Sequence, residues 1–556
     1  MRRTAVSDPI ARPDPLDPQP AHIEAGRAAA VRRVASPVGL VVLVLAAAVM
    51  RLALLGNQQL FRDEATSWYL ASHSLGDIFR LGAHETFPPL YVVLLHGWMA
   101  LFGDSEASLR LPSVIAGIAT VIVTWRWARS ALGETEAWIA GIVVAFSPLL
   151  VVNARDARMY SVECMFATIA WWLIWLLIAH AGDWTGRRRA IAAIALVLAV
   201  AGEVWTLSLG LPIAALQITF AVVVLVSTRS RSSILAVGCL ALGVLTLAPW
   251  LPNLIATATN GRPFWTPRPD LGDLVSTFGG SFVGQSGGPL PLVVVFAAVP
   301  LFGLATIVGL RSSGRHTRGL VLALALALDF GLIPAVWTFS QFHSIYDPRY
   351  LGAAVPPFAI AVGAGAAALG RLLRPAFRGA RPVSYAVLAS LIVVPLLCST
   401  AFASGQSVSA SGQSQGIDPG REVAQELARV VKPGDVVIAV NAQSYFPLAY
   451  YLDGTGEAQR LGIALYDWHP PGDAFFTGWA DIDSTQRIEP AAVGLVGWRS
   501  AIHLGAANSI WVVSLVDSDH PRIYFTPLES GQLRETDRII VQGNGVLAQI
   551  LKAVPN

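Results

Sequence analysis

The sequence predicts an all-α membrane domain that crosses the bilayer many times, followed by a small C-terminal α/β domain. Of the 556 residues, 54% are hydrophobic and only 13% are charged. Many apolar runs reach the ~20 residues that a helix needs to cross the hydrocarbon layer. After Ala403 the chain becomes rich in Ser, Gly and Gln, and short helical and strand-like segments follow. We therefore expect a tail at 1–36, a membrane domain at 37–403, a linker at 404–416 and a soluble domain at 417–556.

The N-terminal tail is rich in Arg, Pro, Ala and Asp and has no sustained apolar period, which indicates disorder. The first apolar run, 37–56, starts after this tail and is long enough to stay in the membrane. We therefore expect an anchored first helix and no cleaved signal peptide.

About eleven apolar runs are expected to span the membrane. They are 37–56, 109–127, 134–152, 160–180, 190–205, 208–227, 233–252, 289–310, 319–338, 350–369 and 383–403. Short loops rich in arginine separate alternate pairs of runs, and basic loops are retained on the cytosolic side. All of these loops lie on the same side of the membrane as the tail only if the apolar piece 88–103 does not cross the membrane. We expect that piece to form a juxtamembrane helix at the outer interface.

An odd number of crossings places the C-terminal domain outside the cytosol. Within it, Glu422 to Val431 has helical spacing, and the runs 436–440 and 510–516 are typical of buried strands. The three cysteines of the chain all lie in apolar runs of the membrane domain, so we expect no disulfide framework.

Charged and aromatic side chains gather in loops that this topology places on the outer face. Those of interest are Asp63, Glu64, His84 and Glu85 in the first loop, Arg155, Asp156, Arg158 and Tyr160 in the second, and Arg349 with Tyr350 in the last. Arginines in short outer loops break the insertion rule, and charges at the membrane border usually pair or bind something. A guanidinium fork matches a phosphate. Internal ion pairs, and a solvated first helical turn at Asp63 and Glu64, are the structural alternatives.

The order of these motifs resembles the GT-C glycosyltransferases, in particular the bacterial protein-mannosyltransferase and aminoarabinose-transferase-like group (glycosyltransferase family 39 and relatives). Asp63-Glu64 corresponds to the acidic motif of the family's first loop. The other matching segments are His84–Tyr91, Leu109–Ser113, Ala154–Ser161 and Asp347–Leu351. The chain departs from the family where residues separate His84 from Pro88, and where Asp156 replaces a Glu that precedes Ala-Arg.

The resemblance implies a GT-C-like plasma-membrane enzyme that transfers a sugar from a polyprenyl-phosphate donor in the outer leaflet. The acceptor would be a protein, a glycolipid or a cell-wall glycan. Asp63 would be the general base for the acceptor hydroxyl, and Glu64 would orient Asp63 or the acceptor. The arginines and Asp156 of the second loop would hold the donor phosphate or the charges of the site. Arg349 with Tyr350 is the expected phosphate clamp, because charge grows on the leaving phosphate.

No metal is required by this resemblance, and the sequence shows no nucleotide-binding glycine loop and no sign of a nucleic-acid partner. A transporter or flippase for a lipid-linked or anionic solute is the main alternative, although transporters often contain internal repeats. A scaffold whose outer domain binds cell-wall polymer is a third interpretation. The sequence leaves the sugar and the acceptor open.

Overall fold

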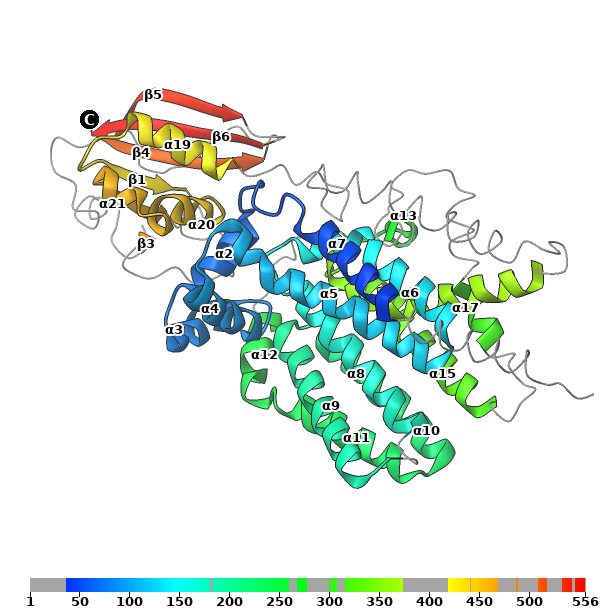
Figure 1. Cartoon of the computed structure of the whole chain (residues 1–556). Coiled ribbons are helices and arrows are strands. Elements are labelled where there is room, and N and C mark those ends of the chain that lie inside the picture. Colours follow the sequence, from blue (N-terminus) through cyan, green and yellow to red (C-terminus); the bar gives the residue numbers. More distant parts are fainter. Residues whose placement is uncertain are drawn as a thin grey trace, which may run out of the picture.

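The structure is a computed structural model with a long helical body and an α/β domain at one end (Figure 1). It describes residues 37–180, 184–259, 268–277, 300–301, 303–307, 316–373, 419–440, 442–468, 487–488, 509–517, 533–542 and 546–555. The predicted combination of a mostly helical body with a C-terminal sheet is thus confirmed.

Seven helical segments of the described chain are long and apolar enough to cross a membrane. Four of them are single helices: Glu106–Ala131 (α5), Tyr160–His180 (α8), Gly186–Thr206 (α9) and Gly210–Thr228 (α10). The other three each combine two elements. Arg231–Thr259 contains α11 (Arg231–Leu245) and α12 (Leu251–Thr259), Leu322–Phe339 comes from α15 (His316–Phe330) and α16 (Leu332–Phe339), and Pro348–Leu372 contains a 3-10 turn (Pro348–Ala354) and most of α17 (Val355–Leu373). An eighth is bent by 54° between Glu134–Phe146 (α6) and Pro148–Ala154 (α7). Pro148 opens the second half, where its missing N–H breaks the helical ladder.

All eight segments coincide with runs expected to cross. The runs 289–310 and 383–403 lie largely or wholly outside the described residues, so the total of eleven spans stays a prediction. The first run forms a helix at Pro37–Leu52 that is shorter than the other candidate spans. Leu90–Phe102 (α4) has only 13 residues, which fits a helix that does not cross, and its place at the interface also stays a prediction.

Short helices connect the first run to the rest of the body. They are Arg62–Ala71 (α2), Leu75–Leu81 (α3) and a 3-10 turn at Gly82–His84, and a further short helix is Leu271–Ser276 (α13). In Figure 1, α2 lies between the α/β domain and the long helices. The motif Asp63-Glu64 therefore starts a helix at the junction of the two parts.

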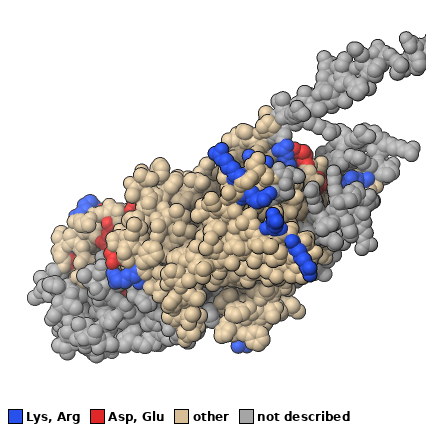
Figure 2. All heavy atoms as spheres, turned by 90° about the horizontal axis from the view of Figure 1, so that it is seen from below, with Lys and Arg blue, Asp and Glu red and all other residues tan. Residues whose placement is uncertain are grey.

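Small residues bring the central helices close together. A Cβ on Gly363 of α17 would lie only 2.6 Å from the backbone oxygen of Glu136 in α6. Small residues commonly allow such approach between membrane helices. On the face shown in Figure 2, charged side chains gather toward the two ends, and the broad middle is nearly free of them. This distribution fits a protein that crosses a membrane several times.

The C-terminal domain contains a six-stranded sheet with the order β3-β2-β1-β4-β6-β5. Its strands are Val436–Ala439 (β1), Ala464–Trp468 (β2), Arg487–Ile488 (β3), Ile510–Asp517 (β4), Leu533–Gln542 (β5) and Val546–Pro555 (β6). β1 pairs in parallel with β2 and β4, whereas β6 runs antiparallel to β4 and β5. The described part of the domain also contains helices Gly420–Val430 (α19), Ala442–Ala449 (α20) and Glu457–Leu461 (α21), with a π turn at Tyr450–Gly454. The predicted helix and both predicted strands are present.

Candidate active site

Glu64 is the anchor of the first-loop motif. It lies in the first turn of α2 and is only 3% exposed. Both of its oxygens accept hydrogen bonds from Arg110 at 2.7 Å, and they also accept the amide N–H groups of Ala157 at 2.9 Å and Phe61 at 3.0 Å. Burial acts to raise the pKa of Glu64, but the Arg110 ion pair and the two amide bonds lower it overall. Because its oxygens are fully engaged, this geometry favours a role for Glu64 in orienting its neighbour Asp63.

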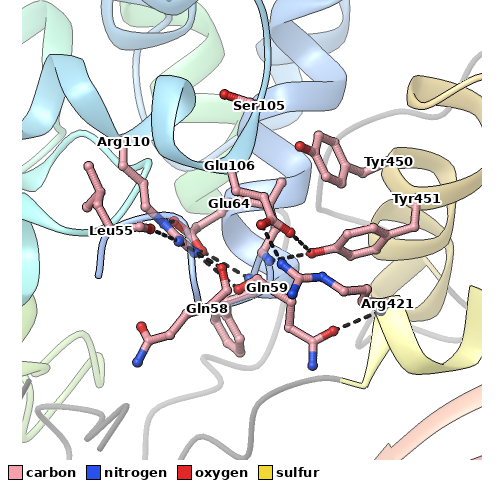
Figure 3. A network of polar contacts seen from close by, with 12 residues as sticks. Leu55, Gln58, Gln59, Glu64, Ser105, Glu106, Arg110, Arg421, Tyr450 and Tyr451 are labelled. Atoms are coloured by element: carbon pink, nitrogen blue, oxygen red, sulfur yellow. Dashed lines mark hydrogen bonds and ion pairs between the residues drawn. The ribbon is translucent and has the colours of Figure 1, made fainter. Parts of the chain in front are cut away.

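Arg110 completes this anchor from the start of α5. Its guanidinium also donates to the backbone oxygens of Leu55 at 2.7 Å, Gln58 at 2.9 Å and Gln59 at 3.1 Å (Figure 3). From the sequence, Arg110 was expected only as part of the Leu109–Ser113 motif and not as a residue of the site. The available signal was an arginine inside the apolar start of a span, where an unpaired charge would be costly.

Asp63 takes a different direction from its neighbour. Its side chain is 15% exposed, and its Oδ2 lies 3.6 Å from Nη1 of Arg349. Nε and Nη2 of Arg349 lie 3.2 Å from Oδ2 of Asp347. Asp347 thus fixes the guanidinium so that Nη1 faces Asp63. The structure brings together an acid that follows the first helix and an arginine that precedes α17.

Two tyrosines flank the same guanidinium. The ring centroids of Tyr160 and Tyr350 lie 6.0 Å and 5.9 Å from Cζ of Arg349, and 5.6 Å from each other. A cation at this distance from an aromatic ring is attracted to it. Tyr160 and Tyr350 therefore help to hold Arg349 in the site in which the sequence placed all three residues.

Arg158 binds the backbone of α2 at Asp63. Its Nη1 donates to the backbone oxygen of Asp63 at 3.1 Å and to Oγ of Ser67 at 3.3 Å. Its guanidinium also stacks 4.9 Å from the ring centroid of Phe87. Burial acts to lower the pKa of Arg158, but nearby Tyr160 and carboxylates raise it overall. Arg158 is therefore a fixed cation that holds the backbone of α2.

The other two charged residues of the second loop are less constrained. The pKa of Asp156 is raised well above its usual range, first by burial and then by repulsion from Glu64. Arg155 is half-buried, and its side chain forms no hydrogen bond or ion pair with the described part of the chain. Burial, followed by repulsion from Arg110, lowers the pKa of Arg155. Arg155 is thus the guanidinium of the site most available to an external anion.

The remaining predicted residues, His84 and Glu85, close a short turn before α4. Glu85 is buried and is one of the carboxylates that raise the pKa of Arg158. His84 is the last residue of the 3-10 turn, and its side chain is not among the parts of the chain that the structure describes. The structure therefore brings Glu85 to the site through Arg158, and the expected role of His84 stays a prediction.

The charges of the site nearly balance. Its five carboxyl groups and four guanidinium groups give a formal charge of −1 if all are ionised, and a proton on Asp156 makes it neutral. The acids are Asp63, Glu64, Glu85, Asp156 and Asp347, and the bases are Arg110, Arg155, Arg158 and Arg349. Within the described part of the chain, no cluster of three His, Cys, Asp or Glu side chains could hold a metal ion.

Comparisons with known proteins identify the fold. Residues 86–255 match a family model described as dolichyl-phosphate-mannose-protein mannosyltransferase. The crystal structure of ArnT from Cupriavidus metallidurans in the apo state is 16% identical, with a TM-score of 0.59 over 93% of this chain and 98% of that chain. The structure of that protein bound to undecaprenyl phosphate has a TM-score of 0.55 at 16% identity, over 92% of this chain and 98% of that chain.

The apo oligosaccharyltransferase of Archaeoglobus fulgidus is 12% identical, with a TM-score of 0.51 over 86% of this chain and 69% of that chain. No curated protein sequence matches the chain. The resemblance to the GT-C glycosyltransferases that the motifs indicated is confirmed by the family match and by the shared fold.

Proposed function

We propose that the protein is a membrane glycosyltransferase that moves a sugar from a polyprenyl-phosphate donor to an acceptor outside the cytosol. The observation that carries this proposal is the meeting of Asp63 and Arg349 in one partly exposed site. A carboxylate and a guanidinium in contact supply a base for the acceptor and a cation for the leaving phosphate. The similar fold of a protein that binds undecaprenyl phosphate supports the class of donor.

In the proposed reaction, the acceptor oxygen attacks the anomeric carbon while Asp63 takes its proton. The bond between that carbon and the phosphate oxygen breaks, and its electron pair stays on the phosphate. A direct displacement of this kind inverts the anomeric centre. The separation of 3.6 Å between Asp63 and Arg349 is longer than the ~2.7–2.9 Å of a strong charge-assisted hydrogen bond. Asp63 is therefore held near Arg349 but keeps capacity to bind the acceptor hydroxyl.

Arg349 and Arg155 would receive the donor phosphate. Arg349 is oriented by Asp347, and the side chain of Arg155 needs to break no hydrogen bond or ion pair with the described residues. The raised pKa of Asp156 favours its protonated form, and a protonated Asp156 would donate a hydrogen bond to a phosphate oxygen and leave the site neutral. Cations held in a partly dry site stabilise the charge that develops on the leaving group.

We further propose that the site faces outward across a cell membrane, with the tail 1–36 in the cytosol and the domain 417–556 outside, joined by the linker 404–416. The topology expected from the arginine-rich loops supports this orientation. The acceptor then reaches Asp63 from the extracytoplasmic side, where proteins, glycolipids and cell-wall glycans are available.

The test is release of polyprenyl phosphate by the purified protein in lipid nanodiscs, supplied with polyprenyl-phosphate sugars and candidate acceptors. Asp63→Asn should abolish turnover while the protein stays folded. Asp77→Asn is the matched control, because Asp77 is an exposed aspartate of α3 that pairs with Arg80 at 3.0 Å away from the site. Equal turnover in the Asp63 variant removes the base from the mechanism. Solute uptake into vesicles without polyprenyl phosphate release favours the transporter.

A further inference from the structure

The start of α2 is bound to the C-terminal domain by side chains that lie more than 300 residues away in the sequence. Gln59 accepts the amide N–H of Arg421 at 2.8 Å and donates to the carboxylate of Glu422 at 2.7 Å. The hydroxyl of Tyr451 accepts the amide N–H of Leu60 at 2.8 Å. These bonds hold the two residues that precede Phe61, the N-cap residue of α2.

The same groups converge on the first residue of α5. Tyr451 donates its hydroxyl proton to Glu106 at 2.5 Å, and the guanidinium of Arg421 also binds Glu106. Figure 3 shows Glu106, Tyr451 and Arg421 pointing toward one another, next to the contact between Glu64 and Arg110. We name Gln59, Glu106, Arg421 and Tyr451 the domain clamp.

Aromatic packing extends this contact along α2. Trp68 meets the ring of Tyr450 edge-on at 5.2 Å, and Tyr69 meets the rings of Tyr445 and Phe446 at 5.9 Å and 5.2 Å. All of these α2 residues lie within two turns of Asp63. The C-terminal domain therefore covers the helix that carries the proposed base.

We propose that the domain clamp positions Asp63 for proton transfer, so that the C-terminal domain is required for transfer although the candidate site contains none of its described residues. This inference rests on the proposed function of Asp63. Leu60 is fully buried, and Tyr451 supplies the acceptor for its amide. Without that acceptor, the segment 59–61 must shift so that the buried Leu60 amide finds another partner. This shift also moves the carboxylate of Asp63, which follows the segment. The donor site at Arg155 and Arg349 is built from other segments and stays in place.

The test compares Tyr451→Phe with Tyr450→Phe. The first removes the acceptor of the Leu60 amide and keeps the ring. The second is a matched control, because the hydroxyl of Tyr450 donates only to the backbone oxygen of Asp104, at 3.0 Å, outside the segment that leads into α2. We expect Tyr451→Phe to lower kcat about tenfold and leave the donor KM within about twofold, since small misplacements of a catalytic group cost up to about 100-fold. Tyr450→Phe should match the wild type in both constants.

Amide hydrogen exchange supplies a readout that does not depend on turnover. Exchange at residues 59–61 should be faster in Tyr451→Phe and unchanged in Tyr450→Phe. Gln59→Met, which removes two clamp bonds from the other side, should reproduce both effects of Tyr451→Phe.

The clamp is refuted if Tyr451→Phe keeps wild-type kcat, or if both tyrosine variants lose activity in parallel with their melting temperatures. It is also refuted if the donor KM rises while kcat is unchanged. A protein that turns over normally in Tyr451→Phe but not in Asp63→Asn retains the proposed function and loses only the clamp. If no donor supports turnover by the wild type, the proposed function fails, and unchanged exchange at residues 59–61 then decides against the clamp by itself.

Discussion

Replacing Glu64 by glutamine tests whether the site is built on a buried ion pair. The side chains of Glu64 and Arg110 are each 4% exposed, and two parallel hydrogen bonds of 2.7 Å join them. Glutamine has nearly the same shape but carries no charge, and its NH2 group would face donors. The guanidinium of Arg110 would then be buried without a counter-charge.

Removing one partner of a buried ion pair typically destabilises a protein by about 3–5 kcal/mol. We expect the loss of stability in Glu64→Gln to lie near the upper end of this range, because Glu64 also accepts hydrogen bonds from the amides of Ala157 and Phe61. The matched control is Glu134→Gln, since Glu134 pairs with Arg129 at 2.6 Å while both side chains are about half exposed. Exposed pairs contribute only about 0–1 kcal/mol.

The assay is unfolding of the purified protein in one detergent, combined with a double-mutant cycle between Glu64→Gln and Arg110→Met. If the pair is formed, the double variant should be at least as stable as the less stable single variant. The reason is that Arg110→Met removes the guanidinium charge that Glu64→Gln leaves buried without a partner. Single effects that simply add, to within about 0.5 kcal/mol, would refute the reasoning. A Glu64→Gln variant as stable as Glu134→Gln would refute it as well.

The remaining predictions concern the donor. Arg349→Ala should lower kcat and raise the donor KM, because leaving-group charge grows in the transition state. The control is Arg80→Ala, since Arg80 is an exposed arginine of α3. Unchanged donor kinetics in Arg349→Ala would exclude its role as the phosphate clamp. Arg155→Ala should raise the donor KM with little change in the melting temperature, because no side-chain hydrogen bond or ion pair with the described residues is lost. A large loss of stability would contradict this assignment. For Asp156, whose pKa is raised, the proton is present at low pH and leaves as pH rises, and the site then gains a negative charge that repels phosphate. The donor KM should therefore rise with pH in the wild type but not in Asp156→Asn, and parallel pH profiles would count against a protonated Asp156.

The membrane spans could be predicted because the length of an apolar run is a local property. The sequence predicted, from the alternation of arginine-rich loops, that Asp63 and Arg349 lie on one face, and the structure brings their side chains to 3.6 Å from each other. The different directions of Asp63 and Glu64 were not predicted, although successive residues of a helix point about 100° apart. The position of Gln59 against Arg421 could not be predicted, because nothing in either segment specifies a partner 362 residues away.

In the proposed mechanism, the two adjacent carboxylates of α2 divide the requirements of a general base between them. A base must be positioned accurately, yet its oxygens must be able to exchange partners during proton transfer. Glu64 supplies the first property, because four hydrogen bonds lock it to α5, the second loop and the start of its own helix. Arg158 adds to this by binding the backbone oxygen of Asp63, so the main chain of Asp63 is fixed. Among the described residues, the ion pair of its side chain is the 3.6 Å contact with Arg349. The rigidity of Glu64 thus allows the carboxylate of Asp63 to remain loosely held, which explains why the two acids stand side by side and are not interchangeable.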